Sequence, residues 1–381
     1  MSLISRSLPV YSLPNCCGCR KEGRWLTVNR LLHYRAVVLF VLCLALAAPL
    51  APVLASAEQP DAAQRYYERG AGLLRKGDLP AAAEAVRKAI ELNPSSAEAY
   101  RLLGQILFKE RNPSDAVEAF THAVKLKPKY AEALNDLAEV YLAQGKSAEA
   151  EQALTRAIDV NPKHAESYLD LAKAYEQRHE SSDALKTYQR LLTVVPNQPE
   201  ALFALATLYD GQGEAKAASD MLRRLTKSNP KHANGWYLNG RIAERNNDLI
   251  EAAYSYKQAV AAKPDLVDAH YNLGFIYRSQ GRPNEAEREF LEVLRYRPEY
   301  AEAHMNLGVI YTGLNRLEEA EQSYERAVEL KPDYAEAHYN LGVFYELNRK
   351  DLPKALAQYH RYLKLGGRDD RVERIVGSGG R

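Results

Sequence analysis

Proline recurs every 34 residues through most of this 381-residue chain. The eight prolines of this series are Pro94, Pro128, Pro162, Pro196, Pro230, Pro264, Pro298 and Pro332. The residue twelve places before each of them is alanine: Ala82, Ala116, Ala150, Ala184, Ala218, Ala252, Ala286 and Ala320. A fixed period of this length indicates a repeat array, in which each unit packs against its neighbours. We number the places in a unit so that the proline stands at place 32.

Each unit predicts two amphipathic helices. Places 4, 7, 8 and 11 carry apolar or small residues at helical spacing, and places 20, 24 and 27 do the same for a second helix. Small residues at places 8, 20 and 27 allow two backbones to approach, and large residues at 4, 11 and 24 fill the space between them. The proline cannot continue the second helix and marks the turn into the next unit.

This pattern resembles the tetratricopeptide repeat family from about residue 63 to residue 365. The second unit carries the match in Tyr100, Leu103, Gly104, Leu107, Ala116, Phe120, Ala123 and Pro128, and the eighth in His304, Leu307, Gly308, Tyr311, Ala320, Tyr324, Ala327 and Pro332. The resemblance implies an all-α fold, a right-handed superhelical solenoid of about nine helix-turn-helix repeats. The expected repeats are 63–96, 97–130, 131–164, 165–198, 199–232, 233–266, 267–300, 301–334 and an irregular ninth at 335–367.

The ninth repeat and the residues after it depart from the pattern. The ninth needs one extra residue near Asp351 and lacks the proline, so we expect Gly366 and Gly367 to end its second helix. Residues 368–381 are charged and then glycine-rich, which predicts a flexible tail. The sixth repeat has Asn239 where leucine is usual, with Leu238 one place earlier.

Residues 1–57 predict export across a membrane. Residues 36–55 contain no charge, six basic residues and one acidic residue precede them, and Ala55, Ser56 and Ala57 form a small-x-small site before Glu58. The segment reads either as a cleaved signal peptide or as an uncleaved N-terminal membrane anchor, because the apolar run is just long enough to span a bilayer. We therefore expect a periplasmic or secreted protein, anchored if the segment is retained.

The cysteine content and the charge agree with a periplasmic or secreted protein. All four cysteines precede Glu58, and removing residues 1–57 leaves 45 basic and 48 acidic residues. A long repeat array buries its core by stacking and needs no disulfide. Near-neutral mixed charge without a basic stripe does not predict nucleic-acid binding.

The repeats carry no motif that predicts catalysis, a cofactor or a metal. There is no P-loop, dinucleotide-binding glycine motif, His-Glu-x-x-His or Gly-x-Ser-x-Gly sequence, so we expect a protein that is not an enzyme. His270, His304 and His338 recur at place 4 of three successive repeats, too far apart to share one ion. We interpret them as replacements for the usual aromatic residue on a packed helix face.

A protein-binding surface is the strongest functional prediction. In this family the first helices line the concave face, and here places 5 and 9 of those helices become apolar toward the C-terminus. Place 6 becomes asparagine within Asn-Leu-Gly in repeats seven to nine, which resembles the repeat arm of O-linked N-acetylglucosamine transferase, where similar asparagines hold the backbone of an extended peptide. The predicted peptide-binding residues are Tyr237, Tyr271, Asn272, Phe275, Met305, Asn306, Val309, Tyr339, Asn340 and Val343.

Packing between repeats is the alternative role for these residues. The resemblance brings no catalytic module, because only a short tail follows repeat nine. The first functional hypothesis is a scaffold that binds a protein or peptide segment in its groove and supports assembly of an envelope complex. The second is a structural or secretion-accessory protein of a polymer-export or envelope-biogenesis system that acts through its outer face. A regulatory arm of an enzyme complex is the third, and the sequence leaves the partner, pathway and oligomeric state open.

Overall fold

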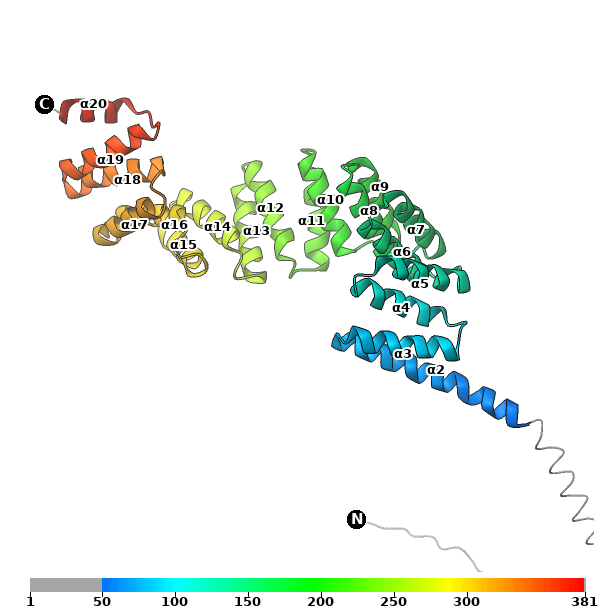
Figure 1. Cartoon of the computed structure of the whole chain (residues 1–381). Coiled ribbons are helices and arrows are strands. Elements are labelled where there is room, and N and C mark those ends of the chain that lie inside the picture. Colours follow the sequence, from blue (N-terminus) through cyan, green and yellow to red (C-terminus); the bar gives the residue numbers. More distant parts are fainter. Residues whose placement is uncertain (1–49, 380–381) are drawn as a thin grey trace, which may run out of the picture. The chain divides into compact units, whose positions relative to one another are not determined.

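The computed structural model describes residues 50–379, and every regular element in that part of the chain is a helix (Figure 1). The chain divides into two compact bodies between Glu110 and Arg111, inside the second repeat. We call residues 50–110 the N-terminal body and residues 111–379 the C-terminal body. The fold class is all-α with repeated helical hairpins, as the sequence predicted.

The N-terminal body contains three helices: α2 (Leu50–Lys76), α3 (Leu79–Leu92) and α4 (Ala97–Lys109). Helix α3 packs against both of its neighbours. Its apolar face carries Ala82 and Val86, which are fully buried together with Ile106 of α4. These residues recur at helical spacing, which explains why one stripe of α3 forms the centre of this body.

The C-terminal body continues the same alternation of first and second helices (Figure 1). Its helices are α5 (Pro113–Leu126), α6 (Ala131–Ala143), α7 (Ser147–Val160), α8 (Ala165–Gln177), α9 (Ser181–Val194), α10 (Pro199–Gly211), α11 (Ala215–Ser228), α12 (Ala233–Arg245), α13 (Leu249–Ala262), α14 (Val267–Ser279), α15 (Pro283–Tyr296), α16 (Ala301–Gly313), α17 (Leu317–Leu330), α18 (Ala335–Phe344), the π-helical turn η1 (Tyr345–Arg349), α19 (Leu352–Lys364) and α20 (Asp370–Gly379). From α6 onward each second helix packs on the first helix of its own repeat and on the first helix of the next.

The small residues of the repeat lie where two helices cross, as predicted. The alanines at place 20 are fully buried. A Cβ atom added to Gly308 at place 8 would lie 2.6 Å from the ring of Tyr324 at place 24, and the same spacing joins Gly342 to Tyr359. The ring therefore occupies the space that the missing side chain leaves, which fixes the distance between the two helices of a repeat.

The extra residue of repeat nine is absorbed in its first helix. Helix α18 continues into η1, where the backbone widens to π-helical pairing before Lys350 takes a left-handed conformation with φ of 55°. An inserted residue in a helix commonly produces such a bulge. Asp351 then caps α19, and Gly366, with φ of 88°, ends it as predicted.

The prediction of a flexible tail is wrong for most of its length. Helix α20 packs on α19, its Val372 is fully buried, and Ile375 and Val376 are half-buried against the same apolar cluster. Arg371 of α20 also pairs with Glu346 at 2.6 Å. Valine and isoleucine at spacings of three and four residues were the available signal. The helix acts as a terminal cap on the last repeat, a common need in repeat arrays.

The predicted export segment lies mostly outside the described residues. Its apolar run, 36–55, precedes or overlaps only the first residues of α2. None of the helices within residues 50–379 combines the length and the apolar character required for a membrane span.

Candidate protein-binding face

The first helices of repeats seven to nine place the predicted peptide-binding residues side by side. Helix α14 contacts α16, and α16 contacts α18. Places 5, 6 and 9 fall on one side of each helix because its period is 3.6 residues. We call the side chains at these places in α14, α16 and α18 the first-helix face. Tyr237 occupies place 5 of the preceding first helix, α12.

Aromatic and aliphatic side chains make up the accessible part of this face. Phe275 is 41% exposed, and the guanidinium of Arg278 lies 4.9 Å from its ring centroid. Tyr271 is half-buried and packs against the rings of Phe290 and Tyr300 at centroid distances of 5.6 and 5.4 Å. This arrangement presents one exposed ring beside one that is held firmly in place.

The same composition continues on α18. Tyr339 is half-buried against the ring of Tyr362 at 5.2 Å, and Val309 and Val343 are also half-buried. Their accessible carbon atoms extend the apolar surface from α14 to α18. Such a surface can bury an apolar side chain of a partner without large rearrangement, because its rings are already packed on one side.

Met305 and Asn306 depart from the prediction of an accessible surface. Met305 is 3% exposed and packs with Ala327 and Ala337, and Asn306 is 1% exposed. Met305 is covered by the second helix α17, through Ala327, and by the next first helix α18, through Ala337. These two residues therefore contribute to the packing of the face and not to its surface.

The asparagines at place 6 link each first helix to the preceding one. The side-chain amide of Asn306 donates to the hydroxyl of Tyr271 at 3.4 Å, and that of Asn340 donates to the sulfur of Met305 at 3.5 Å. The side chain of Asn272 opposes the rise in pKa that burial causes at the phenols of both Tyr237 and Tyr256, so it lies near both hydroxyls. Both hydrogen-bonded pairs join place 6 to place 5 of the preceding repeat, so these asparagines link consecutive first helices.

Within the part of the chain that the structure describes, the side-chain oxygen of Asn306 is buried without a hydrogen-bond donor, whereas its amide nitrogen has an acceptor. Its amide donates to the backbone carbonyl of Glu302 at 2.7 Å, whereas its Oδ1 is buried and has no hydrogen-bond partner within the described residues. A buried polar atom without a partner is costly. This oxygen is the one unsatisfied point we identify among Asn272, Asn306 and Asn340 of the described chain.

Two titratable groups on or beside the first-helix face, Tyr271 and Glu302, have shifted pKa values. Burial raises the pKa of the Tyr271 phenol, although the hydrogen bond from Asn306 opposes that shift. Burial also acts to raise the pKa of Glu302, but its 2.8 Å ion pair with Lys331 and a hydrogen bond from its own backbone amide together outweigh burial and hold that pKa below its ordinary value. At neutral pH the tyrosine is thus a neutral hydroxyl and the glutamate a paired anion.

The three histidines at place 4 serve the turns between repeats. The Nε2 atoms of His270, His304 and His338 lie 3.0, 3.0 and 3.1 Å from the carbonyl oxygens of the prolines six residues earlier. The indole of Trp236, also at place 4, donates to Pro230 O at 3.0 Å. The side chain at place 4 of these four repeats therefore hydrogen-bonds the first helix to the proline turn that precedes it. Among residues 50–379, no set of three or more histidine, cysteine or acidic side chains is arranged to hold a metal ion.

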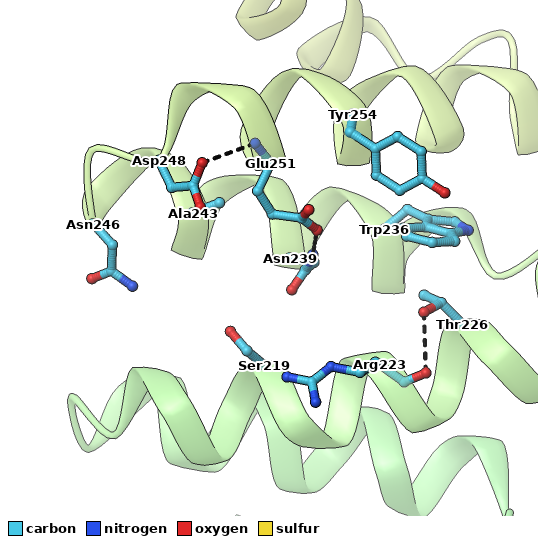
Figure 2. Close-up of a pocket in the computed structure, with 10 residues that line it drawn as sticks. All are labelled: Ser219, Arg223, Thr226, Trp236, Asn239, Ala243, Asn246, Asp248, Glu251 and Tyr254. Atoms are coloured by element: carbon cyan, nitrogen blue, oxygen red, sulfur yellow. Dashed lines mark hydrogen bonds between the residues drawn. The ribbon is translucent and has the colours of Figure 1, made fainter.

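Sequence reasoning missed a polar pocket in repeat six. The cavity measures about 460 Å³ and lies between α11 and the hairpin of α12 and α13 (Figure 2). Asn239 lines it, and the departure from leucine at that place was the available signal. Ala243, where tyrosine is most frequent among the repeats, was a second signal.

Two family models match consecutive parts of the chain. The model described as the cytochrome c-type biogenesis protein H TPR domain matches residues 54–202. A tetratricopeptide repeat model matches residues 203–267, 271–335 and 313–370. The matches extend from the start of the repeats to the second helix of repeat nine. A comparison with curated proteins found no match.

Several solved structures are similar to parts of the chain. The pilF protein of Pseudomonas aeruginosa is 25% identical, with 54% of this chain and 94% of that chain covered and a TM-score of 0.47. YrrB, described as a TPR protein with an unusual peptide-binding site, is 24% identical over 49% of this chain and 96% of its own, with a TM-score of 0.44. A thermophilic TPR protein of Thermus thermophilus is 26% identical over 48% of this chain and 98% of its own, with a TM-score of 0.37.

Proposed function

This chain belongs to the tetratricopeptide repeat proteins, and we propose that it is an exported scaffold that binds a protein segment on its first-helix face and supports assembly of an envelope complex. Proteins of this repeat family serve generally as protein-interaction scaffolds. The finer part of the proposal concerns where the segment binds, where the protein acts and what the binding is for.

The exposed ring of Phe275 is the observation on which the binding site rests. It is a large apolar side chain 41% exposed on a helix whose neighbouring aromatic, Tyr271, is half-buried. Aromatic residues that are partly packed before binding commonly carry the energy of an interface, because little conformational entropy is lost when the partner arrives. Val309, Tyr339 and Val343 extend the same face toward α18.

We assign the asparagines a positioning role on this face. The amides of Asn306 and Asn340 donate to place 5 of the preceding repeat, and Asn272 lies near the hydroxyl of Tyr237. Direct pairing with a peptide backbone, as in the glycosyltransferase repeat arm, would require Asn272 and Asn340 to exchange these contacts for bonds to the peptide. A segment bound over Phe275 needs no such exchange.

The N-terminal sequence supports export, whereas the family model supports a role in complex assembly. The basic flank, the uncharged run 36–55 and the small-x-small site before Glu58 favour translocation. The family model over residues 54–202 is named for a biogenesis protein, which agrees with a role in assembling another protein. Sequencing of the mature N-terminus after cell fractionation tests the first point: we expect Glu58, or a membrane-held uncleaved chain. A cytoplasmic chain of full length would contradict export.

Site-specific photo-crosslinking tests the binding face. A photoreactive phenylalanine analogue replaces Phe275 in one protein and Gln152 of α7 in a matched control, and the captured partner is identified in the cells that make the protein. Affinity for that partner is then measured for the wild type, Phe275→Ala and Tyr339→Ala. We expect each variant to lose about 30-fold, or about 2 kcal/mol.

The outcomes distinguish the two functional hypotheses. Crosslinking at residue 275 with loss of affinity in correctly folded variants supports the first-helix face. Crosslinking confined to residue 152 on the second helix α7, with unchanged affinity in both variants, would favour the secretion-accessory hypothesis, in which the outer face binds the partner.

A further inference from the structure

The pocket of repeat six exists because three residues that close the corresponding space elsewhere are missing. In repeat eight, Tyr311 at place 11 is buried beneath the guanidinium of Arg316, 4.2 Å from the ring centroid. Arg316 pairs in turn with Glu287, at place 21 of repeat seven, at 2.8 Å. This trio of ring, arginine and glutamate seals the junction between consecutive repeats.

Related closures occur in repeats four and nine, where the arginine stands at place 14 and place 15, and the ring of repeat nine is at place 10. Arg178 lies 5.0 Å from the ring centroid of Tyr175 and pairs with Glu151 at 2.9 Å. In repeat nine Arg349 pairs with Glu321 at 2.8 Å. Its guanidinium lies 5.7 Å from the ring centroid of Phe344. The glutamate stands at place 21 of the preceding repeat in all three cases.

Repeat six replaces each member of the trio. The place of the tyrosine is taken by Ala243, that of the glutamate by Ser219, and the place of Arg316 by Asp248. The leucine at place 7 of the neighbouring repeats is Asn239. Repeat six therefore has neither a ring nor an arginine at these places, although Arg245 at place 13 pairs with Asp210 of repeat five, and a cavity of about 460 Å³ is open at this junction.

The walls of the pocket offer acceptors and an aromatic face. The amide of Asn239 donates to Glu251 Oε1 at 2.8 Å, and Figure 2 shows its oxygen turned across the pocket toward α11. Trp236 and Tyr254 form an edge-to-face pair at one end, with ring centroids 5.7 Å apart. An aromatic face is a favourable contact for an arginine side chain, and carboxylates are strong acceptors for its guanidinium.

The charge of the lining also favours a cation. Arg223 lines the α11 side but is already paired with Asp220 at 3.0 Å. The other charged lining residues, Asp248 and Glu251, are both acidic. An entering arginine would restore the cation that the trio loses at this junction.

The exposed surface of α13 next to the pocket points to a protein as the source of that arginine. Tyr254 lines the pocket and is 51% exposed, and Ile250, one turn earlier on α13, is 83% exposed. At the same two places the other seven regular repeats carry charged, polar or small residues or proline. An exposed aliphatic and aromatic pair beside a polar pocket offers apolar contact to the residues that flank an inserted side chain.

We propose that the pocket between α11 and the hairpin of α12 and α13 receives an arginine side chain of a partner protein, whose neighbouring apolar residues lie on Ile250 and Tyr254. The aliphatic part of the arginine packs on Trp236 at one end of the pocket, and its guanidinium donates to Asn239 Oδ1 and to the carboxylates of Glu251 and Asp248 toward the other end (Figure 2). This site is separate from the first-helix face and does not depend on it.

Peptide pools with one fixed residue test the proposal. Four pools of nine-residue peptides carry arginine, lysine, glutamine or glutamate at the centre and mixed residues elsewhere, and the full chain is titrated with each. We expect the arginine pool to bind at least tenfold better than the glutamate pool. In the filled variant Asn239→Leu with Ala243→Tyr, which returns both places to residues found elsewhere in the array, the preference should fall below twofold.

Two further variants separate charge from shape. Asp248→Asn with Glu251→Gln keeps the helix cap and the contact with Asn239 but removes both charges, and should reduce arginine binding several-fold. Phe275→Ala should leave the arginine preference unchanged, which keeps this result distinct from the first-helix face. An arginine preference that survives in the filled variant overturns the proposal, as does equal binding of all pools. A glutamate preference that disappears in Arg223→Gln would show an anion pocket instead.

Discussion

Repeats six and eight have the same length and the same proline and alanine, yet one of them is open where the other is closed. Both keep the contact of glycine with tyrosine inside the hairpin: Gly240 faces Tyr256 as Gly308 faces Tyr324. They differ at the junction with the preceding repeat, where Tyr311 is buried and Ala243 lines a pocket. The repeat pattern therefore contains two separable sets of residues, one that builds a hairpin and one that seals it to its neighbour.

The first prediction separates the two sets by truncation. Tyr324→Ala should destabilise repeat eight by about 3 to 5 kcal/mol, because the ring is buried and Gly308 offers nothing to fill the space. Tyr254→Ala in repeat six should change stability by less than about 0.5 kcal/mol, because the ring is half exposed. Native-state amide exchange measures both, since unfolding in an array is local. Similar losses in the two variants would show that the exposed ring also belongs to the packed core.

The second prediction tests how closely the helices of a hairpin approach. Gly308→Ala places a Cβ atom 2.6 Å from the ring of Tyr324 and should cost about 1 to 3 kcal/mol. Gly313→Ala is the matched control at the end of the same helix, where no heavy atom lies within 4 Å of the added Cβ. The control should be neutral or slightly stabilising because alanine favours the helix. Thermal unfolding of both variants gives the comparison, and equal midpoints would contradict the predicted contact.

The third prediction closes the open junction. Asn239→Leu with Ala243→Tyr should stabilise repeat six by about 0.5 to 2 kcal/mol, the usual gain from filling a cavity with residues compatible with the fold. Amide exchange in α11, α12 and α13 should slow, and exchange in α16 and α17 should stay as it is. Faster exchange in repeat six would mean that its backbone cannot accept the tyrosine ring. The absence of that ring would then not be the reason that the pocket is open.

The fold was predictable because the 34-residue spacing of prolines and alanines is visible in the sequence itself. Proline cannot extend a helix and alanine fits a close crossing, so Pro264 and Ala252 fix the hairpin from sequence alone. Helix α20 was missed because three apolar residues, Val372, Ile375 and Val376, form too short a stripe to outweigh the charged and glycine-rich composition around them.

The binding surfaces were less predictable, because exposure depends on neighbours. Met305 and Phe275 were both expected on the accessible side of a first helix, but contacts from the flanking helices bury Met305 and leave Phe275 open. The pocket required three distant substitutions to be considered together. Ser219 carries no signal until the structure shows that the same place elsewhere holds a glutamate paired across the junction.

The last and smallest effect compares His270 and His304, which stand at place 4 of repeats seven and eight. Burial disfavours the charged form of both rings. For His270 the hydrogen bonds to Glu289 at 2.7 Å and to Pro264 O outweigh burial and raise the pKa above the ordinary 6.5. For His304 the bond to Pro298 O does not outweigh it, and the pKa is lowered.

The two histidines therefore act on stability in opposite directions with pH. The contribution of His270 is fully present below pH 6.5 and is lost as pH rises through its raised folded-state pKa. That of His304 is present above pH 6.5 and is lost as pH falls through its lowered pKa. Glu289→Gln should lower the pKa of His270 toward that of His304, so that both rings then destabilise the fold on acidification. Titration of the imidazole NMR signals measures the order of the two pKa values. An unchanged His270 pKa in the variant would mean that the carboxylate at 2.7 Å is not what holds its proton. The difference between the two repeats would then need another cause, because both rings contact a proline carbonyl at 3.0 Å.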